Sequence, residues 1–299
     1  MAVPNPAGTA PTGQHNRGIA IVVLGVLVLT PDGLLTTLVS ADLWTMLFWR
    51  GLLMAIALTV YSLLRRQRQT ASRRALFTLP ALGIAILFAA SSIAFVAAIV
   101  TTSVANTLFL ITAAPLFAAA LARVFLKEPV ALRTIVAIVV TIAGMAIIFG
   151  DGLGRGDLLG DVAAVFAAAC WAGSLVILRH SPQTDAGMAI AFGGYLIAAT
   201  ALFFAPALLV IPADVLWLGL LGLLVLPVSF GLISLGPRYL PASEVSLIVL
   251  LEAVIGPLWA WAFIGQIPTV TSLVGGVVII ATLAVYFRLS LRSGGTASD

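Results

Sequence analysis

Ten apolar runs, each about as long as a membrane-spanning helix, follow one another along this chain. They occupy residues 18–39, 43–64, 76–99, 103–125, 131–150, 158–179, 187–210, 214–236, 243–264 and 270–289. A helix needs roughly 20 apolar residues to cross the hydrocarbon layer of a bilayer. Charged residues make up 9% of the chain, whereas a soluble domain is about 25% charged. We therefore predict an all-α integral membrane protein with ten transmembrane helices.

Both ends of the chain are poor in apolar residues. Residues 1–16 are rich in Pro, Gly and Ala, and residues 291–299 end in a Gly/Ser/Thr-rich stretch. Such compositions cannot bury enough apolar surface to fold. We expect both ends to be disordered cytoplasmic tails. Residues 1–16 also lack the charged segment followed by a short apolar segment that is typical of a signal peptide.

The basic residues predict the orientation of the ten spans in the membrane. With a cytoplasmic N-terminus, thirteen Lys and Arg residues fall on the cytoplasmic side; Arg155 falls outside and Arg50 lies within a span. Cytoplasmic loops carry an excess of Lys and Arg, so this orientation is favoured. We predict a multi-pass protein of a bacterial-type inner membrane with both termini in the cytoplasm. The polybasic connector 65–74 is expected to contact anionic membrane lipid.

The chain also contains an internal repeat. Arg17-Gly18 opens the first span and Arg155-Gly156 opens the sixth. At the offset that places Gly18 on Gly156, residues 105–130 align with 243–268. Five spans in each half insert the second half upside down relative to the first, which is a common transporter design. We therefore predict two inverted five-helix repeats, residues 17–150 and 151–290, around a central cavity.

Several segments resemble the drug/metabolite transporter superfamily in its EamA-type, ten-helix form. These segments are LWTMLFWRGLL around Arg50, SVANTLFLITAAPLFAAALARVFLKEPV in the fourth span, GDLLGDVAAVFAAACWAGSLVILR in the sixth, and PASEVSLIVLLEAVIGPLWAWAFIGQIPT in the ninth. The chain is similar to the amino acid exporters of that group, aromatic ones among them. The resemblance implies a ten-helix basket with cytoplasmic termini and a cavity lined mainly by spans 1, 3, 4, 6, 8 and 9.

Glu252 lies near the middle of the ninth span. A charged carboxylate at the centre of a bilayer costs roughly 2.5–3.5 kcal/mol on insertion scales, so it needs a partner, a proton or water. Three interpretations stay open: Glu252 titrates protons, it binds a substrate ammonium group, or it is a structural acceptor. Two further charged residues, Asp32 and Arg50, lie in the outer halves of the first and second spans. Either they form a fixed pair that holds two helices together, or Arg50 binds a substrate carboxylate.

Other candidates for the cavity wall are aromatic or small polar residues. A small-molecule site needs mostly apolar walls with a few polar groups. Packing against lipid or a neighbouring helix is the alternative role for each, although the resemblance implies that Trp171 lies on an inward-facing helix. These candidates are Ser91, Phe95, Asn106, Trp171 and Tyr195.

Proline and glycine within the spans indicate bends. Proline removes a helical hydrogen bond and kinks a helix. The hinge candidates are Pro31, Pro115, Pro227, Gly256 and Pro257, and we predict that spans 4 and 9 bend as the cavity switches sides; static kinks are the alternative. Gly275-Gly276 in the last span permits close helix packing, within the chain or in a homodimer.

These features together predict a secondary transporter that exports small metabolites, amino acids foremost, by alternating access. Drugs or nucleosides are the alternative substrates, and a channel or scaffold is the alternative class. An enzyme is not expected, because the sequence has no HExxH or GxSxG motif and its two histidines, His15 and His180, lie in polar flanks. With one cysteine, Cys170, and no metal-ligand spacing, no cofactor or metal is expected. Nucleic acid is not expected as a partner.

Overall fold

The computed structural model describes residues 12–67, 78–102, 104–150, 157–206, 208–265 and 270–293, and these residues form helices and short connections without any strand. The helices and helical segments are α1 (Thr12–Leu29), α2 (Asp32–Leu38), α3 (Leu43–Gln67), α4 (Leu79–Thr101), α5 (Val104–Ile111), α6 (Ala114–Leu121), the π-helical segment η2 (Ala122–Leu126), α7 (Leu132–Phe149), α8 (Leu158–His180), α9 (Ala186–Phe204), α10 (Pro212–Leu220), the π-helical segment η4 (Leu221–Val225), α11 (Leu226–Ile233), the 3₁₀ turn η5 (Gly236–Arg238), α12 (Ala242–Val249), α13 (Leu251–Ile264) and α14 (Val270–Ser293).

These elements make up the ten predicted spans. Within the described residues, nine helical stretches are long and apolar enough to cross a membrane, and α7 supplies a shorter tenth. Four spans consist of more than one helical segment: α1 with α2, α5 with α6 and η2, α10 with η4 and α11, and α12 with α13. The predicted all-α fold is confirmed. The spans could be predicted from their apolar length, but the position of each bend could not.

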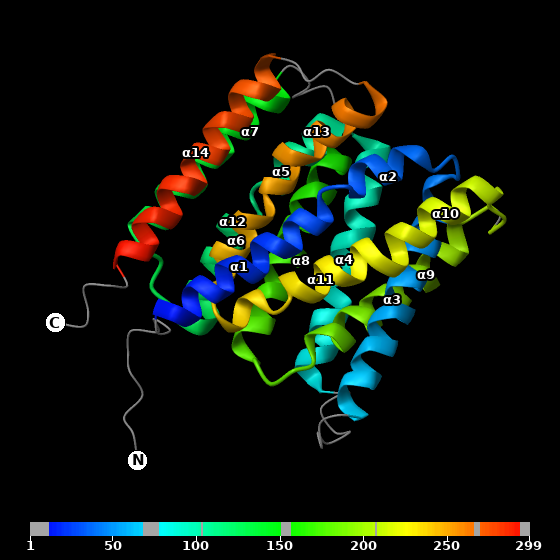
Figure 1. The fold of residues 1–299 in the computed structure, drawn as a ribbon, viewed down its shortest axis with the longest axis horizontal. Coiled ribbons are helices and arrows are strands. Elements are labelled where there is room, and N and C mark those ends of the chain that lie inside the picture. Colours follow the sequence, from blue (N-terminus) through cyan, green and yellow to red (C-terminus); the bar gives the residue numbers. More distant parts are fainter. Residues whose placement is uncertain are drawn as a thin grey trace.

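The contacts between spans pair the two five-helix halves in a symmetric pattern. Figure 1 shows α7 and α14 side by side along one edge of the bundle and α3 close to α9 at the opposite side. These pairs join the fifth span to the tenth and the second to the seventh. Between them, α4 packs on α8 while α1 packs on α11, so the third and sixth spans meet as the eighth and first do. An exchange of the two five-helix halves therefore reproduces the main helix contacts, as the inverted repeat predicts.

Two of the bends follow the repeat offset found in the sequence. In the fourth span α5 ends at Ile111, and in the ninth α12 ends at Val249. These two ends are as far apart in the chain as Gly18 and Gly156, since 249 − 111 equals 156 − 18. A bend at the same place in each half is what two copies of one ancestral backbone design would retain.

Of the hinge candidates, Pro115 and Pro227 lie where one helical segment of a span is followed by the next. Pro115 lies in the first turn of α6, whereas Gly256 and Pro257 lie inside the continuous helix α13, beyond the bend at Leu250. Pro227 lies in the first turn of α11, directly after η4. A hinge role for these residues stays a prediction.

Glycines allow close contact between paired helices. A Cβ on Gly51 of α3 would lie 2.9 Å from the carbonyl oxygen of Gly194, and one on Gly194 of α9 would lie 2.8 Å from that of Gly51. A Cβ on Gly275 would lie 2.5 Å from the carbonyl oxygen of Gly144 on α7, and one on Gly276 would lie 2.9 Å from Val254. Small residues let helix backbones approach in this way. Gly275 and Gly276 thus pack inside the chain, and a homodimer through α14 stays a prediction.

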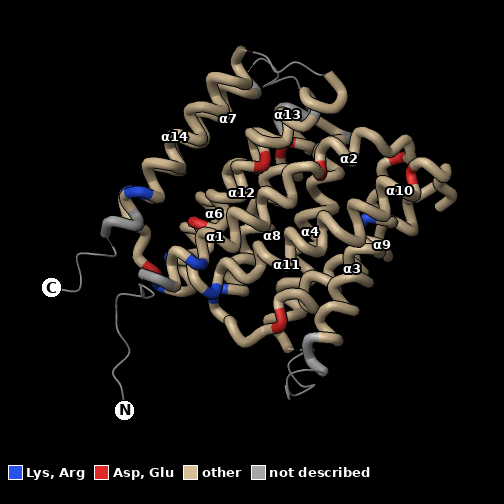
Figure 2. Tube along the Cα trace, viewed as in Figure 1, with Lys and Arg blue, Asp and Glu red and all other residues tan. Residues whose placement is uncertain are grey.

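Charged side chains concentrate at the ends of the helices. Figure 2 shows most of the described Lys and Arg at the end of the bundle where both termini lie. At the opposite end Asp42 caps α3, because its Oδ1 accepts hydrogen bonds from the backbone N–H groups of Trp44 (3.0 Å) and Thr45 (3.2 Å). Burial raises the pKa of Asp42, but the hydrogen bonds from Thr45 and Trp44 outweigh it and hold that pKa below its ordinary value of 3.8.

Candidate functional site: charged residues within the membrane-spanning helices

The first span is interrupted where Pro31 follows Thr30. Proline has no N–H, so the carbonyl of Leu27, four residues earlier, lacks its helical donor. The hydroxyl of Thr30 fills this place and donates a hydrogen bond of 2.8 Å to the Leu27 oxygen. Thr30 is 2% exposed. The sequence Thr-Pro-Asp therefore ends α1 and begins α2 without leaving that carbonyl unpaired.

Helix α13 lies against this interruption. Trp259 donates a hydrogen bond of 2.9 Å from Nε1 to the Thr30 hydroxyl oxygen. One turn earlier, Gly256 is so close that an added Cβ would lie 3.8 Å from the Thr30 carbonyl oxygen. The hydroxyl of Thr30 thus joins the first span to the ninth, which belongs to the other half of the chain.

Asp32 and Arg50 form an ion pair beside the same interruption. Arg50 Nη2 lies 2.9 Å from each carboxylate oxygen of Asp32, and Arg50 Nη1 donates to the Thr36 hydroxyl at 3.0 Å. The side chains of Arg50 and Asp32 are 23% and 17% exposed. Arg50 Nη2 donates a hydrogen bond to Oδ2, whereas Oδ1 accepts none among the described residues. The planar fork of Arg50 is therefore not used as the parallel, two-nitrogen pair that binds carboxylates most strongly.

Glu252 completes this group of charges. It lies in the first turn of α13, directly after the bend at Leu250, where the positive end of the helix dipole favours an anion. Asp32 and Arg50 are the charged residues that interact with it electrostatically. Its carboxylate makes no hydrogen bond or ion pair within the described part of the chain. Asp32 and Glu252 thus carry two negative charges beside the single positive charge of Arg50. The negative charge that Arg50 does not balance needs a proton or a bound cation.

Other predicted cavity residues lie elsewhere. Ser91 donates to the Ala167 carbonyl at 2.8 Å and joins α4 to α8, and the hydroxyls of Tyr195 and Thr59 lie 3.2 Å apart between α9 and α3. Phe95 is half-buried on α4. Asn106 belongs to α5, but its side chain is outside the described part of the structure.

Trp171 belongs to an aromatic cluster between the two halves. Its ring centroid lies 6.0 Å from that of Phe230 and 6.3 Å from that of Phe88, and Phe88 and Phe230 are 5.2 Å apart. The cluster leaves a void of only ≈ 10 Å³. Aromatic side chains therefore fill the region between α4, α8 and α11.

A second polar network, which sequence analysis missed, lies at the end of the bundle that holds the termini. Glu244 is 5% exposed, accepts a hydrogen bond from the Tyr286 hydroxyl at 2.8 Å, and lies 3.7 Å from His15 Nε2. The Tyr286 hydroxyl lies 3.1 Å from that of Thr134. This network ties α12 to α1, α7 and α14. A glutamate in the first turn of an apolar span is the signal that could have indicated it.

Comparison with known proteins identifies the kind of molecule to which this geometry belongs. The profile described as the EamA-like transporter family matches residues 16–150 and 158–288. A protein of Archaeoglobus fulgidus described as an uncharacterized transporter is 26% identical over 211 residues, which cover 69% of this chain and 76% of that protein. A crystal structure 16% identical in sequence superposes with a TM-score of 0.78 over 91% of this chain and 99% of that one, which shows the shared fold. Within the described residues, no group of three His, Cys, Asp or Glu side chains could hold a metal ion.

Proposed function

Because this chain belongs to the EamA-like transporter family, we propose that this secondary transporter of small molecules exports amino acids by alternating access. The observation that carries the proposal is the carboxylate of Glu252, which lies within a membrane-spanning segment beside Asp32 and Arg50 and has no hydrogen-bond partner among the described residues.

An amino acid carries one charged group that can pair with the unpaired carboxylate of this site and one that can pair with its guanidinium. Its ammonium group neutralises the second carboxylate of the Asp32–Arg50–Glu252 group, and its carboxylate competes with Asp32 for the guanidinium of Arg50. Guanidinium binds carboxylates well because its N–H groups match the spacing of the two oxygens. A proton on Glu252 neutralises that carboxylate when the site is empty. Substrate and proton would then exclude each other at Glu252, which makes exchange of one for the other the proposed coupling.

Alternating access needs contacts that differ between two states. In the present state α13 is held to the first span by Trp259 and Thr30, and α12 is held to α1, α7 and α14 through Glu244 and Tyr286. Rocking of one five-helix half against the other would break one of these connections at a time. The concentration of Lys and Arg at the end that holds the termini favours a cytoplasmic position for that end. The proposed location is an inner membrane.

The test uses the purified protein in liposomes preloaded with unlabelled amino acid, with uptake of radiolabelled amino acid measured at several pH values. A carrier gives saturable counterflow, whereas a channel gives flux that does not saturate. We expect Glu252→Gln to lose counterflow at least tenfold and to lose its pH dependence. Glu252→Asp, the matched control, keeps the carboxylate and should retain measurable counterflow.

Two results would contradict the proposal. If Glu252→Gln transports at the wild-type rate with the wild-type pH profile, both the proton and the ammonium roles fail. If no amino acid gives counterflow but a nucleoside or a drug does, the substrate class is wrong while the carrier mechanism stands.

A further inference from the structure

A pocket separate from the charged site opens between α3, α9 and the eighth span. Its volume is ≈ 290 Å³, close to the lower end of the range of about 300–1,000 Å³ found for small-molecule sites. Its walls come from α3, from the first turn of α9 and from η4, α11 and η5. Asp32 and Glu252, the two carboxylates of the charged site, do not line it.

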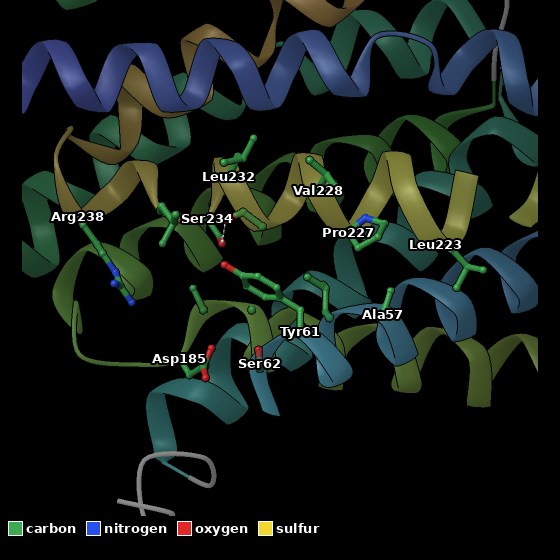
Figure 3. Close-up of a pocket in the computed structure, with 15 residues that line it drawn as sticks. Ala57, Tyr61, Ser62, Asp185, Leu223, Pro227, Val228, Leu232, Ser234 and Arg238 are labelled. Atoms are coloured by element: carbon green, nitrogen blue, oxygen red, sulfur yellow. Dashed lines mark hydrogen bonds between the residues drawn. The ribbon is translucent and has the colours of Figure 1, made fainter. Parts of the chain in front are cut away.

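The pocket has an apolar part and a polar end. Figure 3 shows Ala57, Leu223, Pro227 and Val228 toward one side, and the polar side chains of Ser62, Asp185, Ser234 and Arg238 toward the other. Leu223, Pro227 and Gly231 follow one another at four-residue spacing, so they form one face of the eighth span. A ligand that fits has an extended apolar portion and a polar group at one end.

The mouth of the pocket lies on the lipid-facing surface. Tyr61, Leu223 and Val228 line the pocket and are also exposed. In a membrane-spanning bundle, exposed apolar side chains of this kind contact acyl chains. Tyr61 lies close to the end of its span at Leu64, at the level where tyrosine commonly meets the lipid headgroups. The pocket is therefore continuous with the bilayer, and its polar end faces the headgroup layer.

The polar end contains a hydroxyl that has no acceptor among the described residues, and a guanidinium held in place at one nitrogen. Ser62 is 3% exposed, and its hydroxyl makes no hydrogen bond within the described part of the chain. Arg238 uses Nη2 to donate to the Thr184 carbonyl at 3.0 Å, which holds the guanidinium beside the start of α9. Asp185, which also lines the pocket, caps that helix by accepting from the Met188 N–H at 3.2 Å. Ala186 and Gly187, whose N–H groups belong to the first turn, also line the pocket.

We propose that this pocket binds one phospholipid, with an acyl chain along α3 and α11 and the phosphate at Arg238, Ser62 and the first turn of α9. Three kinds of donor line this end of the pocket: a guanidinium, a buried hydroxyl that has no partner among the described residues, and helix N-terminal N–H groups, which commonly bind phosphate. The bound lipid would occupy the space between the second and eighth spans, which belong to different halves, and would fix the distance between them.

The test measures lipid bound to the purified full-length protein in detergent by native mass spectrometry. We expect one tightly retained phosphatidylglycerol per chain and at least tenfold weaker retention of diacylglycerol with the same acyl chains, which lacks the phosphate. Gly231→Leu places a side chain in the pocket, because a Cβ there meets only Leu58 Cδ2, at 3.8 Å. It should lower retention at least fivefold. Gly219→Leu, in the same span, is the matched control, because a Cβ there meets nothing within 4 Å, and it should bind as the wild type does.

Arg238→Gln and Ser62→Ala test the polar end, and each should lower retention at least threefold; they decide the matter if Gly231→Leu does not fold. The proposal is overturned if diacylglycerol is retained as well as phosphatidylglycerol. It is overturned equally if inorganic phosphate at millimolar concentration displaces the lipid, or if the pocket and control variants bind alike. None of these outcomes depends on which metabolite the protein transports.

Discussion

The hydroxyl of Thr30 should contribute more to stability than an ordinary threonine in a helix, and Thr30→Val tests this. Valine keeps the shape of threonine but removes both hydrogen bonds, the one donated to Leu27 at 2.8 Å and the one accepted from Trp259 at 2.9 Å. A polar group left buried without a partner costs about 1–3 kcal/mol, while hydrogen bonds between membrane helices average about 0.6 kcal/mol. With two groups left unpaired, we expect Thr30→Val to lower the free energy of unfolding by about 2 kcal/mol.

The reasoning predicts a specific rescue. The Leu27 carbonyl depends on Thr30 only because Pro31 has no N–H. In a Pro31→Ala background the new N–H can bond to Leu27, so Thr30→Val should then cost only the Trp259 bond, about 1 kcal/mol or less. The two substitutions should therefore couple by about 1 kcal/mol.

The assay is reversible unfolding in mixed micelles with increasing SDS, followed by circular dichroism for the wild type, both single variants and the double variant. Thr200→Val is the matched control. Thr200 donates to the Leu196 carbonyl at 2.9 Å, but it lies inside the uninterrupted helix α9, where that carbonyl also has its regular N–H partner. The control should change stability by less than about 0.5 kcal/mol. If Thr30→Val costs the same in both backgrounds, the explanation of the break is wrong.

Two further predictions concern the ends of the bundle. Tyr286→Phe should lower the free energy of unfolding by about 1–3 kcal/mol, because it leaves buried Glu244 without its donor. Tyr239→Phe is the control, because the hydroxyl of Tyr239 makes no hydrogen bond within the described residues. Equal effects of the two substitutions in the same assay would contradict the role of the network. At neutral pH, Asp42→Ala should cost about 1 kcal/mol through loss of the α3 cap. Because the pKa of Asp42 is lowered in the folded protein, its charge stabilises the fold at pH values above its ordinary pKa. That contribution is lost as the pH falls through the folded pKa. If the cost of Asp42→Ala, measured by thermal unfolding, does not shrink between pH 6 and pH 3, this explanation is refuted.

The length and composition of the apolar runs were enough to predict the ten spans, because a bilayer requires helices of a narrow range of lengths. The repeat offset also carried structural information. It was derived from Gly18 and Gly156, yet the bends after Ile111 and Val249 are separated by the same offset. Proline positions alone were less informative, because Pro257 lies within a continuous helix while Leu250, with no proline nearby, marks the bend.

The contacts within the site could not be predicted in the same way. Which residue meets Thr30 depends on how α13 is rotated about its axis, and hydrophobic periodicity is too weak in a helix that is apolar all round to predict that rotation. The same limit applies to Glu244, whose partners come from α1, α7 and α14. Asp32, Arg50 and Glu252 were recognised because a charge within an apolar span is rare and costly, which marks a residue without saying what it contacts.

The two halves share a backbone design but not its chemistry. The bends of the fourth and ninth spans correspond, yet the repeat offset places Ala114, the first residue of α6, on Glu252, the second residue of α13. The ninth span therefore carries two acidic residues, Glu244 before its bend and Glu252 after it. Glu244 is tied to the end that holds the termini, and Glu252 lies with Asp32 and Arg50 toward the other end. Both acidic residues lie on one span, so we expect a change of angle at Leu250 to alter the position of Glu252 relative to Glu244 and with it the contacts at both ends of the bundle. That coupling is what a carrier needs in order to open one side only when the other is closed.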